Sequence, residues 1–123
     1  MLVKYTNLLD KMALISFEDF LKVEICVGTI LTAEENNSLK KPSIILTIDF
    51  GEKIGIKKSS AQLKENYNCV DLINKQVAAI INFRSKQIGN LNSEVLVLGF
   101  PDENNEPVLV TPDFKVKNGK RLY

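Results

Sequence analysis

The chain has 123 residues, of which 45% are hydrophobic, and its formal net charge is +1. This length and composition fit one domain with a single core, and the charge provides no overall field for nucleic acid or an anionic membrane. The sequence contains no histidine, which removes the commonest general base and the usual zinc ligand. We therefore expect a non-catalytic protein without a metal or cofactor, in which any basic site is local.

Residues 1–14 show no clear period and are expected to form a flexible N-terminal extension, followed by one domain over residues 15–123. The extension is interrupted by Lys4, Asp10 and Lys11, so it lacks the apolar region of a secretory signal. No apolar run approaches the roughly 20 residues of a spanning helix. These features predict a cytoplasmic protein that does not insert into membranes.

The first elements of the domain follow from local signals. Ser16 resembles a helix N-cap with acidic Glu18 in the first turn, so a short helix is expected to end near Lys22. Alternating apolar residues predict strands over 23–31, 43–50 and 54–57, with a polar loop over 33–42. Gly28 indicates a bulge or sharp bend in the first strand. Two hydroxyls open residues 59–65, which predicts a short capped helix.

Residues 76–98 form the most informative stretch of the chain. Residues 76–83 and 94–98 alternate like two strands, and their connecting loop carries Arg84 and Lys86. The pattern predicts an apolar hairpin with a basic tip. Phe50 and Phe83 fall on strand faces that are expected to be buried. A loop over 99–107, a short strand over 108–110 and a tail containing several lysines complete the chain.

The two cysteines, Cys26 and Cys69, lie in apolar contexts without a CxxC spacing. We expect two reduced, buried thiols, and a disulfide between them is the alternative.

Three strands, a helix and two further strands match the order of the OB-fold, a five-stranded Greek-key barrel whose loops flank a binding face. On that plan, basic residues gather on one face, where they suit phosphate groups. They are Lys40, Lys41, Lys53, Lys57, Lys58, Arg84 and Lys86. The alternative is that these residues only coat the solvent side of the strands and loops. Aromatic residues are sparse, so any bound nucleic acid is expected to stack few bases.

A second set of polar residues lies near the same face, although its serines also fit helix capping and its asparagine also fits a turn. The set comprises Ser59, Ser60, Gln62, Asn82, Ser93 and Glu94. It contains no carboxylate pair, activated nucleophile or phosphate-binding glycine loop, so it gives no case for catalysis.

Five segments carry a resemblance to a known family: residues 23–30 (VEICVGTI), 46–51 (LTIDFG), 54–62 (IGIKKSSAQ), 72–77 (LINKQV) and 93–99 (SEVLVLG). From Phe17 onward the chain resembles the tRNA-binding domain family, most of all its free-standing CsaA-like members, described as secretion chaperones. One departure is Cys26, which follows Glu24 and Ile25 where the family usually has arginine.

The resemblance implies a homodimeric OB-fold that binds tRNA, or else an export-related chaperone that binds unfolded or precursor polypeptides. Carried over by position, the RNA-binding residues are Lys57, Ser59, Ser60, Gln62, Asn82, Arg84, Ser93 and Glu94, and Lys86 joins them from the same loop. The dimer interface would contain Phe17, Phe20, Val108 and Val110. Loss of the arginine at position 26 implies loss of any ion pair or phosphate contact made there.

Overall fold

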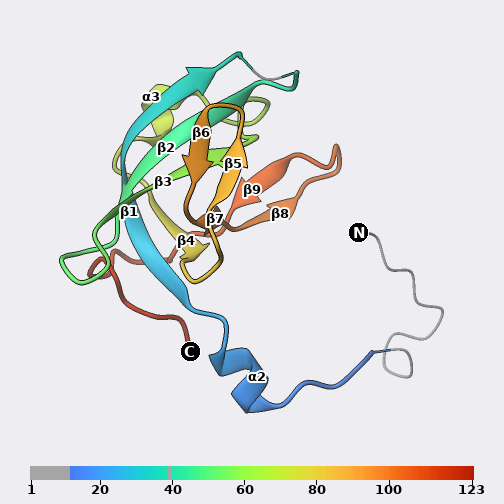
Figure 1. Cartoon of the computed structure of the whole chain (residues 1–123), viewed down its shortest axis with the longest axis vertical. Helices are drawn as coiled ribbons and strands as arrows, with labels where there is room; N and C mark the ends of the chain where they lie inside the picture. Colours follow the sequence, from blue (N-terminus) through green and yellow to red (C-terminus); the bar gives the residue numbers. More distant parts are fainter. Residues whose placement is uncertain (1–11, 39) are drawn as a thin grey trace.

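The computed structural model describes residues 12–38 and 40–123, and its main element is a curled antiparallel sheet (Figure 1). The sheet contains β1 (Ile25–Asn36), β2 (Ser43–Asp49), β3 (Ile56–Ala61), β4 (Gln76–Ile80) and β7 (Leu96–Val97), in the order β3-β2-β1-β4-β7. The first part of β1 pairs with β4 and the remainder with β2, so β1 joins both sides of the curl. This arrangement confirms the predicted mainly β, OB-like fold.

The bend in β1 depends on a close approach at Gly28. A Cβ atom there would lie 2.6 Å from Cγ2 of Ile48 and 2.7 Å from Cδ1 of Phe50, so only glycine lets β2 pack against this point. The pairing of β1 with β2 changes register between Ile30 and Thr32. The irregularity expected at Gly28 therefore lies slightly further along the strand.

The core lies inside the curl and follows the alternation of β2. Ile44, Leu46 and Ile48 are almost fully buried, and Phe50, 1% exposed, continues the same face just beyond the strand. The other members of this cluster with almost no exposed surface are Ile30, Leu63, Leu72, Val77 and Ala79. Residues far apart in the sequence thus form one core, as the composition predicts.

The two edge strands of the sheet are connected by hydrogen bonds where they approach each other. The Ser59 hydroxyl donates to the carbonyl of Val95 at 3.0 Å, and the Glu94 N–H donates to the carbonyl of Lys58 at 2.8 Å. Because Ser59 lies on β3 and Val95 immediately precedes β7, these bonds hold the open side of the curl together.

The prediction of a helix over residues 59–65 is wrong. Ser59 and Ser60 pair with Leu46 and Ile45 in the ladder between β3 and β2, so their hydroxyls serve a strand. The third strand consequently starts and ends later than predicted. The helix of this region is α3 (Cys69–Leu72), which follows the N-cap residue Asn68.

Other boundaries also differ. β1 continues to Asn36 through the predicted loop because its backbone pairs with β2 up to Ser43. The predicted strands over 76–83 and 94–98 are shorter, and their connection forms a hairpin of β5 (Lys86–Ile88) and β6 (Leu91–Ser93). The predicted loop after Leu98 contains β8 (Gly99–Pro101), which pairs with β9 (Pro107–Leu109).

Helix α2 (Phe17–Leu21) precedes the sheet and projects from it (Figure 1). The Ser16 hydroxyl accepts a hydrogen bond from the Asp19 N–H at 3.0 Å, which confirms the predicted N-cap. The predicted flexible extension falls mostly on residues 1–11, which lie outside the described part of the chain. It therefore stays a prediction.

Residues 111–123, here called the C-terminal segment, return to the start of β1. The Gly119 N–H donates to the Val27 carbonyl at 2.8 Å, and the Val27 N–H donates to the Lys120 carbonyl at 3.0 Å. A bridge between Cys26 and Arg121 continues this pairing. The C-terminal segment thereby covers the edge of β1 on the side away from β4.

Candidate nucleic-acid interface

A groove of about 390 Å³ lies between β3, the β5–β6 hairpin and the start of β7, and we call it the β5–β6 groove. Five of the predicted RNA-binding residues line it, namely Ser60, Arg84, Lys86, Ser93 and Glu94. Its other lining residues are apolar: Phe83, Ile88, Val95 and Leu96. The groove can thus offer positive charge and apolar contact to the same ligand.

Hydrogen bonds between β3 and residues 93–94 fix one wall of this groove. The Lys58 N–H donates to Oε1 of Glu94 at 3.0 Å, and the Ser60 N–H donates to the Ser93 hydroxyl at 3.0 Å. Oε2 of Glu94 also lies 3.9 Å from Nζ of Lys57. Glu94 therefore holds the wall and partly neutralises Lys57.

Arg84 and Lys86 are the cations that line the groove directly. Neither forms an ion pair with a carboxylate in the part of the chain that the structure describes. Both side chains belong to exposed residues at the start of the β5–β6 hairpin. Their charge is therefore available to an anionic ligand.

Four predicted site residues do not line the groove. Lys57 lies beside its wall, 3.9 Å from Glu94. Ser59 is 2% exposed, and its hydroxyl is used in the bond to Val95. Gln62 lines a separate small hollow beside Lys41 and Lys64. Asn82 is bound to the connection between α2 and β1. Their direct role in RNA binding stays a prediction that the geometry of the groove does not favour.

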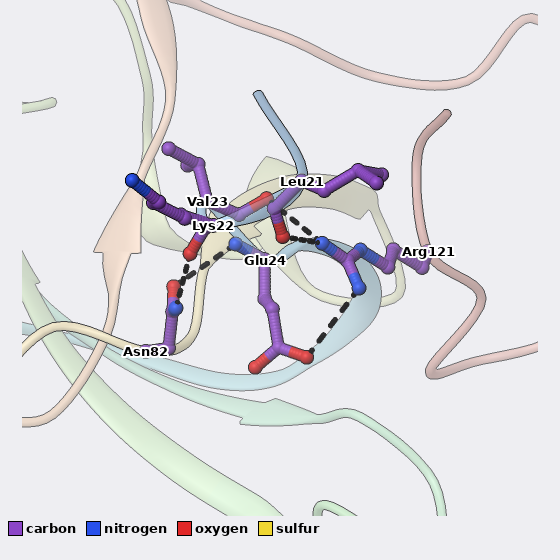
Figure 2. A network of polar contacts seen from close by, with 6 residues as sticks. All are labelled: Leu21, Lys22, Val23, Glu24, Asn82 and Arg121. Carbon is purple, nitrogen blue, oxygen red and sulfur yellow. Dashed lines mark hydrogen bonds and ion pairs between the residues drawn. The ribbon is translucent and has the colours of Figure 1, made fainter. Parts of the chain in front are cut away.

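Figure 2 shows the hydrogen bonds between Asn82 and the connection from α2 to β1. Its Nδ2 donates to the Lys22 carbonyl at 2.7 Å, and its Oδ1 accepts from the Glu24 N–H at 2.9 Å. Because Asn82 immediately precedes Phe83 and Arg84, this contact fixes the backbone that leads into the β5–β6 groove.

Arg121 approaches the same connection from the C-terminal segment (Figure 2). Its guanidinium donates to the Leu21 carbonyl and lies 3.6 Å from a carboxylate oxygen of Glu24. Arg121 also bridges the backbone of Cys26, the position where the family pattern has arginine. Glu24 thus has a cation from the C-terminal segment. The loss of the contacts that an arginine at position 26 would make stays a prediction.

Phe83 lies in the groove and not in the core, contrary to the prediction from the sequence. It is 55% exposed and lines the groove, although the strand alternation predicted that it would be buried. The alternation does not apply because β4 ends at Ile80. The polar residues on either side, Asn82 and Arg84, were the available signal that the strand had ended.

Both cysteines are free, as predicted, but only Cys26 is buried and Cys69 is half-buried. Burial raises the pKa of the Cys26 thiol, and nearby Glu24 raises it further. Burial is also the main reason for the raised pKa of Cys69, with Glu35 adding to it.

We expect both thiols to alkylate slowly at pH 8, since the thiolate is the reactive form and a raised pKa keeps its fraction small. The alkylation rate should rise through a higher pH range than that of an ordinary thiol. Cys69 should react before Cys26, whose exposed fraction is 4%. Mass spectrometry after iodoacetamide treatment measures both rates, and the urea-unfolded chain is the control. Equal rates for the two folded-state thiols would contradict the assignment.

No helix within residues 12–38 and 40–123 is long and apolar enough to cross a membrane. The same residues contain no group of three histidine, cysteine or acidic side chains placed to hold a metal ion.

The curled sheet with a cationic and apolar groove defines an OB-like binding module. The chain belongs to the tRNA-binding domain family, because the model described as "Putative tRNA binding domain" matches residues 25–121. The structure is similar to the chaperone CsaA from Bacillus anthracis, with a TM-score of 0.85 and 42% identity over 90% of this chain and 100% of that one. CsaA from Picrophilus torridus gives a TM-score of 0.83 and 42% identity, covering 89% and 100% of the two chains.

Larger relatives contain a similar module. The methionine–tRNA ligase of Methanococcoides burtonii is 34% identical over 110 residues, which is 89% of this chain and 16% of the ligase. The chain therefore spans about a sixth of the length of this relative, and the likeness concerns that part alone.

Proposed function

We propose that the protein is a cytoplasmic, non-catalytic homodimer that binds tRNA through the β5–β6 groove. The observation that carries this proposal is that Arg84 and Lys86 line the groove without a described carboxylate partner. Each phosphate that a cation neutralises releases counterions and adds affinity that does not depend on sequence. Exposed Phe83, in the same groove, offers a face on which one unpaired base can stack.

The homodimer is supported by apolar surface at two places. Helix α2 exposes Phe17, whose ring centroid lies 6.1 Å from that of half-buried Phe20. A second, apolar groove of about 560 Å³ is lined by Ile25, Ala78 and Val110, among others. Val108 exposes 44% of its surface, also near the end of the chain. A two-fold axis would bring two sets of groove cations to one ligand, which offsets the small net charge.

A second candidate function is binding of unfolded or precursor polypeptides. The observation that favours it is the apolar lining of the β5–β6 groove, where Phe83 and Leu96 expose about half of their surface. Apolar side chains grouped in an exposed groove are typical of interaction sites. The two CsaA proteins to which this structure is similar are known as chaperones, which supports this candidate.

Titration of the purified protein with bulk tRNA and with an unfolded polypeptide, at several salt concentrations, separates these functions. We expect Arg84→Ala to weaken tRNA binding and to lower the slope of log K against log salt by about 0.7–0.9, the contribution of one phosphate contact. Lys57→Ala should have a smaller effect because Glu94 already lies 3.9 Å from its ammonium group. Neither change should shift the melting temperature.

Lys22→Ala is the matched control. Lys22 is also an exposed cation, but it does not line the β5–β6 groove and it already pairs with Asp19. Polypeptide binding that ignores salt, together with absent tRNA binding, would reject the tRNA proposal and support the second candidate. Unfolding of the Arg84 variant would show that this residue is structural.

A further inference from the structure

We propose that the C-terminal segment and Lys75 form a second phosphate-binding face for the same RNA, and this inference rests on the proposed function. Residues 113–121 contain four of the 16 basic residues and one of the 15 acidic ones, which gives them a net charge of +3. The rest of the chain therefore carries −2. The strongest local concentration of positive charge lies outside the β5–β6 groove.

The lysines of this face are held in fixed positions. Gln76 binds both backbone groups of Val116, since its Oε1 accepts from the N–H at 3.0 Å and its Nε2 donates to the carbonyl at 2.6 Å. Asn118 accepts from the Thr29 hydroxyl at 2.7 Å. With the backbone bonds of Gly119 and Lys120 to Val27, these contacts fix the segment against β1 and β4.

The charges of this face are available. Lys75, Lys115, Lys117 and Lys120 form no ion pair with a carboxylate of the described residues, whereas Arg121 is paired with Glu24. Lys117 and Lys120 also line the apolar groove that supports the homodimer, whereas Lys75 and Lys115 do not. Lys115 and Lys117 are both exposed and lie two positions apart in the chain.

A hollow of about 390 Å³ marks where one phosphate would lie. Lys75 and Lys115 line it together with Asn74 and Thr111. The side-chain amide of Asn74 and the hydroxyl of Thr111 have no hydrogen-bond partner among the described residues, so both can donate to phosphate oxygens. Lys117 lines a neighbouring hollow of about 590 Å³ with Lys53, although Glu52 lies there as well.

RNA fits this face better than a lipid surface does. Phe114, 80% exposed, immediately precedes Lys115, and a ring beside a cation suits a nucleic acid in which one base stacks while a phosphate is bound. The C-terminal segment contains no helix, so it is not an amphipathic helix of the kind that lies in a bilayer surface.

The two faces lie at opposite edges of one row of paired strands. Arg121 bridges Cys26, which pairs with Ala79, which in turn pairs with Val97 of β7. β1 and β4 therefore lie between the C-terminal segment and β7, whose first residue lines the groove. A single phosphate cannot contact both faces, whereas one folded RNA can.

The test is Lys115→Gln/Lys117→Gln in the full chain, titrated with bulk tRNA at several salt concentrations. We expect weaker binding and a slope of log K against log salt that is lower by about 1.4–1.8, the contribution of two phosphates. Lys115→Arg/Lys117→Arg should keep the wild-type slope. Because Lys117 also lines the apolar groove that supports the homodimer, size-exclusion chromatography must give the glutamine variant the same assembly size as the wild type. Lys22→Gln/Lys64→Gln, which removes the same charge from ion-paired lysines, should leave the slope almost unchanged.

Equal slopes for Lys115→Gln/Lys117→Gln and the Lys22/Lys64 control would overturn this inference, while loss of binding in Arg84→Ala would still support the groove. If the wild-type protein fails to bind tRNA even at low salt, the proposed function and this face both fail. Binding to vesicles containing anionic phosphatidylglycerol that depends on Lys115 and Lys117, with unchanged tRNA binding, would assign the face to a membrane and overturn the RNA assignment.

Discussion

Replacing Phe50 by alanine should lower the free energy of unfolding by about 3–5 kcal/mol, the range found when a buried aromatic ring is removed from a core. Phe50 is 1% exposed, and it belongs to the same cluster as Ile44, Leu46 and Ile48. A Cβ at Gly28 would already touch its ring, so the surrounding residues leave little room to collapse into the cavity. Urea denaturation at one protein concentration measures the change.

Phe83→Ala is the matched control for that experiment, because it removes the same ring from an exposed position in the β5–β6 groove. It should change the free energy of unfolding by no more than about 0.5 kcal/mol. It should weaken ligand binding instead. Equal destabilisation by the two substitutions would contradict the placement of these two rings.

The second large effect is expected at Gly119, where alanine should detach the C-terminal segment from the sheet. Gly119 has φ +90°, and an added Cβ would lie 2.5 Å from the backbone carbonyl oxygen of Phe50. A backbone atom cannot turn away as a side chain can. The clash therefore adds about 1–3 kcal/mol, typical of overpacking, to the cost of the left-handed conformation.

Gly55→Ala measures the conformational part of that cost without the clash. Gly55 has nearly the same conformation, φ +89°, but no atom lies within 4 Å of its added Cβ. Its substitution should cost only about 1–2 kcal/mol, the penalty of an L-residue in that conformation. The difference between the two unfolding free energies measures the clash, and equal losses would show that Phe50 and Gly119 are not in contact.

Periodicity predicted those parts of the fold in which one strand face is buried. β2 is the clearest case, because Ile44, Leu46 and Ile48 face the core while their neighbours do not. β3 was placed incorrectly because a pair of serines is a local signal for a helix cap. Ser59 is buried instead by its tertiary neighbours Leu46 and Val95, and neither is visible in the local sequence.

Some residues of the candidate site were also predicted correctly and others were not. The resemblance to the tRNA-binding domain family, with Lys86 added from the same loop, predicted five residues that line one groove: Ser60, Arg84, Lys86, Ser93 and Glu94. Lys57, Ser59, Gln62 and Asn82 do not line it, because side-chain direction depends on how the chain pairs and turns at each position. The ion pair between Arg121 and Glu24 was also unpredictable, since it depends on two ends of the chain meeting in space.

The pairing of the C-terminal segment with β1 has a consequence for the order of events during translation. β1 leaves the ribosome early, whereas residues 119–122, which cover one of its edges, are synthesised after all the strands of the sheet. Until then its backbone groups at Ile25 and Val27 have no partner on that side, and an open strand edge can pair with another nascent chain. Translation products that stop before Gly119 should therefore aggregate more than the full chain does, even though their core residues are all present.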